Sequence, residues 1–262
     1  MTDVTATHPE LRIDVADGVA TLRLARPHKR NALSEPIVAA LGAFFAAPPP
    51  EVRAALICAD GDHFCAGLDL GEHGARTPWA GMENSQIWHE AFGRIERGRI
   101  PVVSALQGAV IGGGLELAVS THVRVADETA FYALPEGQRG IFVGGGASVR
   151  VARVIGMDRI RWLMLTGRRL GADDGQRLGI SHELVAPGEA EGVARELAGQ
   201  IAANAPLTNQ LILAALPRIA DMPTDDGLWA ESIAAALIGT TEDAGEGMRA
   251  FLEKRDPRFR GR

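Results

Sequence analysis

A glutamate stands directly after a glycine-rich turn in the middle of this sequence. Residues 102–106 form a short apolar run of strand length, and glycines occupy positions 112–114. An apolar-rich segment follows at residues 115–119, and it contains Glu116 two residues after the last glycine. The pattern predicts a buried strand, a sharp turn and a helix whose first amides have no acceptor within the helix. Such amides favour negative charge above the turn. The segment therefore supplies donors for a developing negative charge and, in Glu116, a carboxylate for proton transfer.

The glycine turn has a second interpretation when it is taken alone. Three small residues also let a helix pack closely against a strand, with no chemical role. A nucleotide site fits less well, because neither G-x-G-x-x-G nor G-x-x-x-x-G-K-[ST] occurs at this turn. The choice between close packing and chemistry therefore depends on the neighbouring segments.

A second apolar run ends in a turn of the same kind. Residues 52–58 predict a buried strand, and the run Phe64-Cys65-Ala66-Gly67 follows it. Asp69 is expected to cap a short helix after this turn. His63 lies near Cys65, but a pair of potential ligands without others at suitable spacing is typical of a structural role.

Two charged segments are further candidates for the site. Glu136 follows Pro135, which places its carboxylate outside a regular helix, and precedes the glycine-rich residues 137–146. A glutamate in such a turn is commonly a solvated surface group, although its position between two glycine turns favours a role in the site. Residues 28–30, with the sequence His-Lys-Arg, predict either a solvated loop or a contact for phosphates.

The rest of the chain predicts an α/β protein that holds these turns on a sheet. Residues 11–24 predict a β-hairpin, and alternating strands and helices then favour right-handed crossovers and a parallel sheet. Residues 71–81 are expected to form a lid or a pocket wall. Residues 189–254 predict helices with broad apolar faces and no sheet of their own, so we expect them to pack in an oligomer. The expected division is a core at residues 1–195 and a helical region at residues 196–262.

Composition and charge exclude several classes of function. The chain has 262 residues, of which 46% are hydrophobic and 23% charged, as in globular proteins with a large core. Its formal net charge of −6 argues against broad nucleic-acid binding, which requires a basic surface. No apolar run approaches the roughly 18 residues of a membrane span, and no signal-peptide pattern opens the chain. With only Cys58 and Cys65, we expect a cytoplasmic protein with reduced thiols.

In their order and spacing, these motifs resemble the enoyl-CoA hydratase/isomerase (crotonase) superfamily over nearly the whole chain. The segments that carry the resemblance are LARPHKRNAL at 24–33, FCAGLDL at 64–70, GAVIGGGLE at 108–116, LPE at 134–136 and FLEKRDPRF at 251–259. The resemblance implies a spiral of ββα units followed by helices that assemble homotrimers, or hexamers as dimers of trimers. It also implies an acyl-CoA thioester substrate and no separate cofactor, because coenzyme A is part of the substrate.

The resemblance further implies roles for individual residues in catalysis. The amides of Ala66 and Gly113 match an oxyanion hole, whose fixed donors stabilise an enolate-like state more than the ground state. Glu116 and Glu136 match a pair of glutamates that hold a water molecule. Two carboxylates in one small site resist joint ionisation, so one serves as acid and the other as base. Gly144 matches a position whose amide lies near that water.

A further set of residues is implied to bind the substrate. Lys29, Arg30 and Ala32 lie in the segment that borders the CoA nucleotide. Leu68 and Asp69 follow the oxyanion turn near the adenine. Ala66 and Gly113 complete the binding set through the thioester.

Some positions depart from the family pattern. Gly137 replaces a branched apolar residue and is followed by Gln138 and Arg139, and Val143 replaces a proline. These changes alter the wall around the second glutamate, and they bear on the acyl-chain specificity and on the reaction itself.

The leading hypothesis is reversible syn hydration of a trans-2-enoyl-CoA to a 3-hydroxyacyl-CoA, because both glutamates are present. One alternative is an enoyl-CoA isomerase, or a hydratase/lyase that hydrates and then cleaves a hydroxycinnamoyl-CoA. A different class is a noncatalytic acyl-CoA-binding or RNA-associated scaffold on the same fold. The acidic composition and the intact site argue against this last class.

Overall fold

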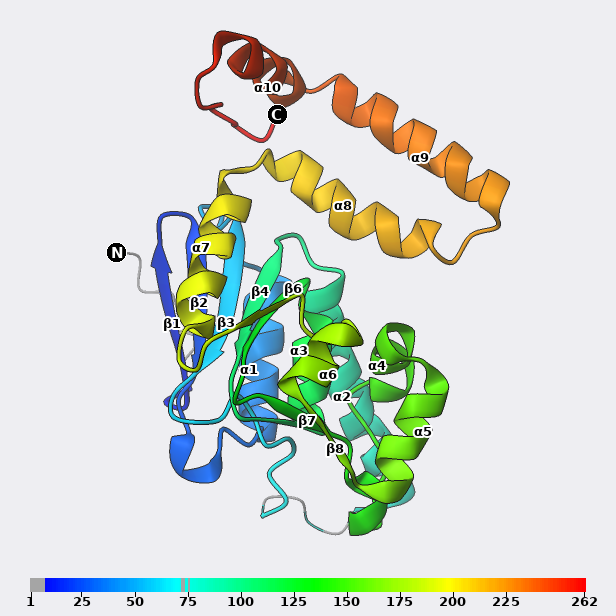
Figure 1. Ribbon diagram of the computed structural model, residues 1–262. Coiled ribbons are helices and arrows are strands. Elements are labelled where there is room, and N and C mark those ends of the chain that lie inside the picture. The colour runs from blue at the N-terminus through cyan, green and yellow to red at the C-terminus, as the bar shows by residue number, and fades with distance from the viewer. Residues whose placement is uncertain (1–7, 72–73, 75) are drawn as a thin grey trace.

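The computed structural model describes residues 8–71, 74 and 76–262, and its centre is a six-stranded sheet with the order β1-β2-β3-β4-β6-β9 (Figure 1). β1 and β2 form the predicted antiparallel hairpin, and every later neighbouring pair is parallel. The α/β prediction is therefore confirmed. The strands are Leu11–Ala16 (β1), Val19–Leu24 (β2), Ala54–Ala59 (β3), Val102–Leu106 (β4), Val123–Asp127 (β6) and Glu183–Val185 (β9).

A second, three-stranded sheet holds the glycine turn that precedes Glu116. It consists of Ala109–Ile111 (β5), Phe131–Ala133 (β7) and Arg169–Gly171 (β8). The sequence did not predict β5 or β8, because strands of three residues are too short to show a period. β5 also pairs with the turn after β3 through an isolated bridge between Cys65 and Val110. The small sheet thus brings the two predicted turns together.

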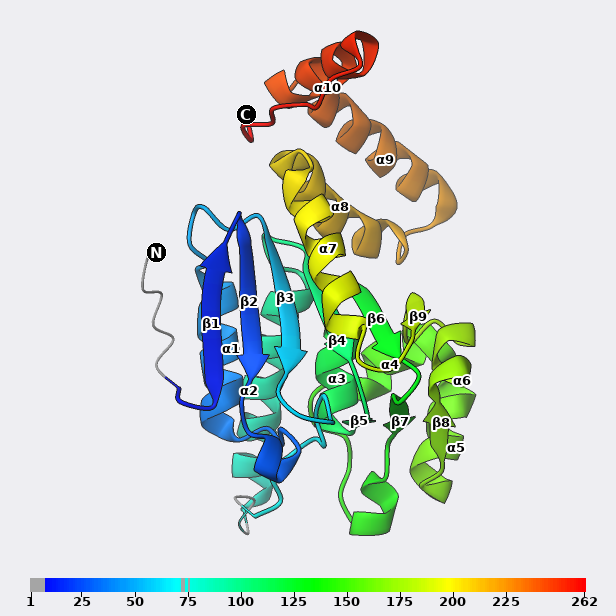
Figure 2. The same ribbon diagram turned by 60° about the vertical axis from the view of Figure 1, so that its left-hand side comes forward.

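Helices cover both faces of the main sheet (Figure 2). On one face, Glu35–Ala46 (α1), Pro78–Glu96 (α2) and Gly113–Ser120 (α3) share the larger hydrophobic core with alternate residues of the strands. On the other face, Ala190–Ala203 (α7) buries its alanines against Leu56, Val103 and Val125. Strands such as β3 are buried along their whole length for this reason.

The remaining helices extend the fold on two sides. Two short 3-10 helices are Pro27–Lys29 (η1), which follows β2, and Glu136–Arg139 (η2), which follows β7. After η2 come Ala147–Ile155 (α4), Met157–Thr166 (α5) and Ala172–Arg177 (α6). Pro206–Ile219 (α8), Thr224–Gly239 (α9) and Glu242–Glu253 (α10) project from the sheet (Figures 1 and 2). No described helix is both long and apolar enough to cross a bilayer.

The C-terminal helices follow the predicted pattern and expose large apolar side chains. Trp229 on α9 is 70% exposed and Phe251 on α10 is 84% exposed, which is unusual for residues of this size. The oligomer remains a prediction that these surfaces support. The division at residue 195 also remains a prediction, and it falls within α7, which packs against the sheet.

Two local predictions after β3 are wrong. No helix follows Asp69 in the described residues before α2, and its carboxylate instead accepts from Arg26, Lys29 and the amide of Gly71. The expected lid at 71–81 is shorter than predicted, since Pro78 and the cap Thr77, which accepts from the Ala80 amide, begin α2 before residue 81. Residues 72, 73 and 75 of that segment lie outside the described residues.

Candidate active site

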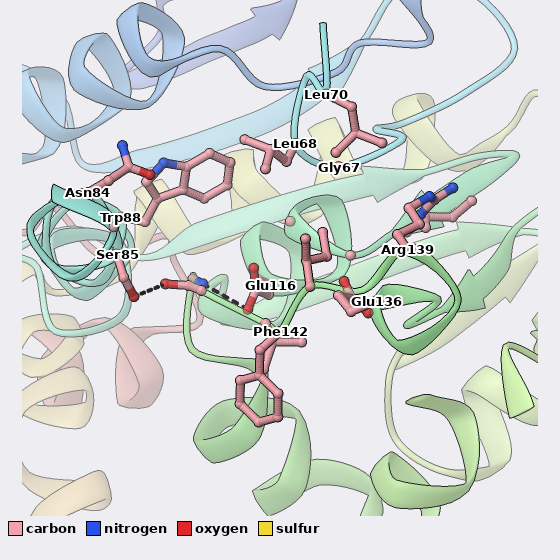
Figure 3. A pocket seen from close by; sticks show the side chains of 18 of the residues that line it. Gly67, Leu68, Leu70, Asn84, Ser85, Trp88, Glu116, Glu136, Arg139 and Phe142 are labelled. Atoms are coloured by element: carbon pink, nitrogen blue, oxygen red, sulfur yellow. Dashed lines mark hydrogen bonds between the residues drawn. The ribbon is translucent and has the colours of Figure 1, made fainter. Parts of the chain in front are cut away.

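A pocket of about 290 Å³ lies where the two glycine turns meet (Figure 3). Its wall comes from parts of four segments: residues 66–70 after β3, residues 81–88 of α2, residues 111–116 at the start of α3, and residues 136–145 between β7 and α4. A Cβ added at Gly67 would lie 2.7 Å from the Ile111 carbonyl oxygen and 3.2 Å from the Gly113 nitrogen. The glycine therefore allows the first turn to approach the second closely.

Glu116 is held at the base of this pocket by main-chain amides. It lies in the first turn of α3 and is only 3% exposed. Its Oε1 accepts hydrogen bonds from the amides of Gly145 and Ala147, both at 2.9 Å. Burial raises the pKa of this carboxyl, while the two amides and the charge of Arg150 oppose the rise. One carboxylate oxygen is therefore fixed in place, and Oε2 makes no hydrogen bond with the described residues.

Glu136 begins η2 immediately after Pro135 and is almost as buried, at 7% exposed. Its Oε2 has no hydrogen-bond partner among the described residues. Burial, together with the negative charge of Glu116 and against the opposing charge of Arg139, raises the pKa of Glu136 to about 7. A carboxyl with this pKa is partly protonated near neutral pH. Its surroundings thus suit a group that donates a proton.

The two glutamates share one pocket but differ in their surroundings. Both line it, and the charge of one affects the pKa of the other. Glu116 accepts from two N–H donors, which favour its charged form, whereas Oε2 of Glu136 has no donor among the described residues. The predicted division into a base and an acid therefore has a physical basis, with Glu116 better suited to be the base.

The amide of Ala66, which was predicted to be a donor of the oxyanion hole, is not free in the structure. The Ala66 amide donates to the Arg30 carbonyl oxygen at 2.9 Å, so it is already occupied. The Gly67 amide donates to Cys65 Sγ, and the Asp69 amide donates to the Leu33 carbonyl oxygen. Between them, the Leu68 amide has no acceptor among the described residues. Leu68, rather than Ala66, therefore presents a free N–H beside the pocket.

The Gly113 amide has no acceptor among the described residues, as the predicted donor role requires. As the first residue of α3 it has no acceptor within the helix, and no hydrogen bond of the described residues uses it. A Cβ added at Gly113 would lie 3.5 Å from the Leu68 nitrogen, so the two amide groups are neighbours. The Gly144 amide also makes no hydrogen bond with the described residues, and Gly144 lines the pocket as predicted.

The residues predicted to border the CoA nucleotide lie away from this pocket. Lys29 Nζ is 3.0 Å from an oxygen of Asp69, and Arg26 contacts the same oxygen at 2.6 Å. The Lys29 and Arg26 contacts lower the pKa of Asp69 to about 2. Arg30 is exposed and has a φ of 51°, whereas Ala32 is 8% exposed. The predicted residues that do line the pocket are Ala66, Leu68, Gly113, Gly144 and the two glutamates.

Helix α2 contributes to the pocket wall, and the individual residues that it contributes were not predicted. Asn84 and Ser85 line the pocket. Trp88 lines it as well and is also buried in the hydrophobic core. Polar residues on an amphipathic helix look like surface residues, so the sequence held no signal for this role. His63 has the structural role expected, since its Nδ1 accepts from the Ala109 amide at 3.2 Å.

Comparisons with known proteins show which family the chain resembles. The sequence profile described as enoyl-CoA hydratase/isomerase matches residues 14–262. An enoyl-CoA hydratase of Mycobacterium tuberculosis is 30% identical over 259 residues, which cover 97% of each chain. The short-chain-enoyl-CoA hydratase of Clostridium acetobutylicum is 32% identical over 240 residues, covering 90% of this chain and 92% of that protein.

The similarity extends to solved structures. One from Rhodopseudomonas palustris, assigned as an enoyl-CoA hydratase, has a TM-score of 0.91 and 48% identity, covering 94% of this chain and 95% of that chain. The predicted crotonase-like fold is therefore confirmed, and the chain belongs to the enoyl-CoA hydratase/isomerase family.

Proposed function

We propose that this protein is an enoyl-CoA hydratase, which adds water reversibly and with syn geometry to a trans-2-enoyl-CoA to give a 3-hydroxyacyl-CoA. Membership of the family supports a hydratase or an isomerase. The observation that favours hydration is the pair of buried carboxylates on one pocket, Glu116 and Glu136, with unequal surroundings. Hydration needs both a base for the water and an acid for the carbon, and this pair supplies both.

Each group has a defined part in the proposed reaction. Glu116 takes a proton from water while the water oxygen bonds to C3 of the enoyl group. The C2–C3 π electrons move toward the thioester oxygen, where the amides of Leu68 and Gly113 stabilise the enolate. Protonated Glu136 then gives its proton to C2. Glu116 has gained one proton and Glu136 has lost one, so exchange with solvent or between the two restores the starting state.

The pocket wall suits an apolar acyl group. The side chains around the two carboxyls are predominantly apolar and include Leu68, Leu70, Trp88, Ile141 and Val143. We propose that the Gly144 amide holds the attacking water, since it is free and lies on the wall. The amides and carboxyls supply charge stabilisation and proton transfer, so the proposed reaction needs no metal or redox cofactor.

Two predictions from the resemblance are retained as proposals. Lys29, Arg30 and Ala32 are proposed to border the CoA nucleotide, outside the described pocket. The exposed apolar faces of α8 to α10 support a homotrimer or a dimer of trimers.

The proposal is tested with a panel of enoyl-CoA thioesters, by following the loss of the conjugated thioester absorbance. Glu116→Gln and Glu136→Gln are each expected to lower the rate at least about 10²-fold. Mass spectra of the products separate added water from a moved double bond or a cleaved chain. Hydration by both variants at the wild-type rate would exclude the proposed acid and base.

A further inference from the structure

A single peptide group connects helix α2 to Glu116. Ser85 on α2 donates its hydroxyl to the Gly144 carbonyl oxygen at 2.7 Å, and the Gly145 amide donates to Glu116 Oε1 at 2.9 Å (Figure 3). The Gly144 carbonyl and the Gly145 N–H belong to the same planar peptide unit. The serine hydroxyl and the catalytic carboxylate therefore bind opposite ends of one rigid group.

This peptide lies in a segment that needs external contacts to hold its conformation. Three consecutive glycines, residues 144–146, have more accessible backbone conformations than any other residue type allows. A Cβ at Gly145 would lie 2.6 Å from Glu116 Oε2, so glycine is required for the close approach. Ser85 and Arg150 bind the consecutive carbonyls of Gly144 and Gly145, at 2.7 and 2.9 Å. The segment is thus fixed from α2 on one side and from α4 on the other.

The hydrogen bond from Ser85 also affects the donor at the far end of the peptide. A bond to an amide carbonyl polarises the peptide and strengthens its N–H as a donor. Without that bond, the Gly144–Gly145 peptide is free to rotate away from the carboxylate. Loss of the Ser85 hydrogen bond therefore weakens the contact between the Gly145 amide and Glu116 in two ways: the N–H becomes a weaker donor, and its orientation is less restrained.

We propose that Ser85 is a positioning residue for Glu116, acting through the Gly144–Gly145 peptide to fix the orientation of the carboxylate. The inference rests on the proposed function in one respect, the role of Glu116 as the base. Its structural part, that Ser85 controls the surroundings of the Glu116 carboxylate, is independent of the reaction. Other charged groups that act on Glu116 are Arg150 of α4 and Glu136 of η2.

The test compares Ser85→Ala with wild type in turnover and in the titration of Glu116. We expect kcat to fall about fivefold to tenfold with a much smaller change in KM, the size of effect that one hydrogen bond supports. The pKa of Glu116, followed by ¹³C NMR of labelled glutamate carboxyls and assigned with Glu116→Gln, should rise by about half a unit or more, because a donor to the charged form is weakened. Gln86→Ala is the matched control, since Gln86 is the exposed neighbour of Ser85 on α2.

The pKa of Glu116 in Ser85→Ala determines whether the inference holds. An unchanged pKa of Glu116 in Ser85→Ala overturns it, even if turnover falls. If wild type hydrates no enoyl-CoA, the proposed function fails, but the titration still tests the positioning role. If Ser85→Ala does not fold, Ser85→Cys gives the same comparison, because a thiol has a similar shape and is a weaker donor.

Discussion

The amides of Leu68 and Gly113 are neighbours, although they come from turns after different strands. A Cβ placed on Gly113 would lie 3.5 Å from the Leu68 nitrogen, and neither amide donates to an acceptor among the described residues. The amide of Ala66, two residues earlier, donates to Arg30 instead. This difference between Ala66 and Leu68 determines which N–H is available to a substrate oxygen.

Replacing the N–H of residue 68 with an ester oxygen should therefore lower kcat/KM for hydration by about 10²-fold or more, the effect of losing one oxyanion donor. The same replacement at residue 66 removes the bond to Arg30, so it should reduce stability and leave kcat near wild type. Steady-state kinetics and thermal unfolding of the two esters provide the comparison. Equal losses of kcat at both positions would contradict the assignment of Leu68.

Gly113→Ala should abolish most activity for a steric reason. The new Cβ would lie 2.8 Å from Trp88 Cζ3, closer than real contacts, and beside the Leu68 amide. We expect kcat/KM to fall by at least about 10²-fold, because a shift of the donors by a fraction of an ångström misplaces them. Gly192→Ala is the control, since a Cβ there meets nothing within 4 Å. Retention of full activity by Gly113→Ala would show that the turn does not bind the reacting atom.

The pKa of Glu136 predicts a pH dependence of the rate. Because the protonated form is the proposed acid and its pKa is about 7, kcat/KM should fall about tenfold per unit above that pH, whereas protonation of the proposed base Glu116 lowers kcat/KM on the acid side. Glu136→Gln should lose most of the rate, and its remaining kcat/KM should not show this fall above pH 7. A profile of kcat/KM from pH 5 to 9 in both proteins measures the effect, and an alkaline fall that survives in Glu136→Gln would assign it to another group.

The same group predicts a pH dependence of stability. The folded pKa of about 7 lies above the ordinary value of 4.5, so the folded state binds the proton more tightly than the unfolded state. Stability from this group is therefore full below about pH 4.5 and is lost as the pH rises to about 7, by up to about 3 kcal/mol. The free energy of unfolding of Glu136→Gln, minus that of wild type, should therefore be larger at pH 8 than at pH 5. Urea titrations of both proteins at the two pH values measure this difference. An equal difference at the two pH values would contradict the raised pKa.

Asp69→Asn should destabilise the fold. Asp69 is 5% exposed and accepts from Arg26 and Lys29, so its neutral replacement leaves a buried guanidinium with a weaker partner. We expect a loss of about 2–4 kcal/mol in the free energy of unfolding at pH 7. The exposed pair of Asp221 with Arg153 is the comparison, and Asp221→Asn should cost less than about 1 kcal/mol. A small effect at Asp69 would mean that Glu10, which also contacts Arg26, satisfies the guanidinium alone.

The sequence alone determined the parts of this protein that depend on neighbouring residues. Periodicity predicted the hairpin, the parallel strands and the C-terminal helices, because burial on one or two faces imposes a pattern along each element. The glycines at 112–114 predicted the start of α3, and Gly112 has the positive φ, 52°, that glycine adopts readily. The two glutamates were found for the same reason, since each lies directly beside a glycine turn.

Only the tertiary structure decided which groups remain free in the site. The acceptor of the Ala66 amide is the carbonyl of Arg30, and the partners of Asp69 are Arg26 and Lys29, all from the earlier loop between β2 and α1. Ser85 meets Gly144 only because α2 packs beside the segment before α4. Hydrogen-bond partners of this kind come together after the chain has folded, so residue types and spacing do not specify them. The candidate acid and base were therefore evident in the sequence, whereas the free amides of the two turns and the contact of Ser85 depended on long-range packing.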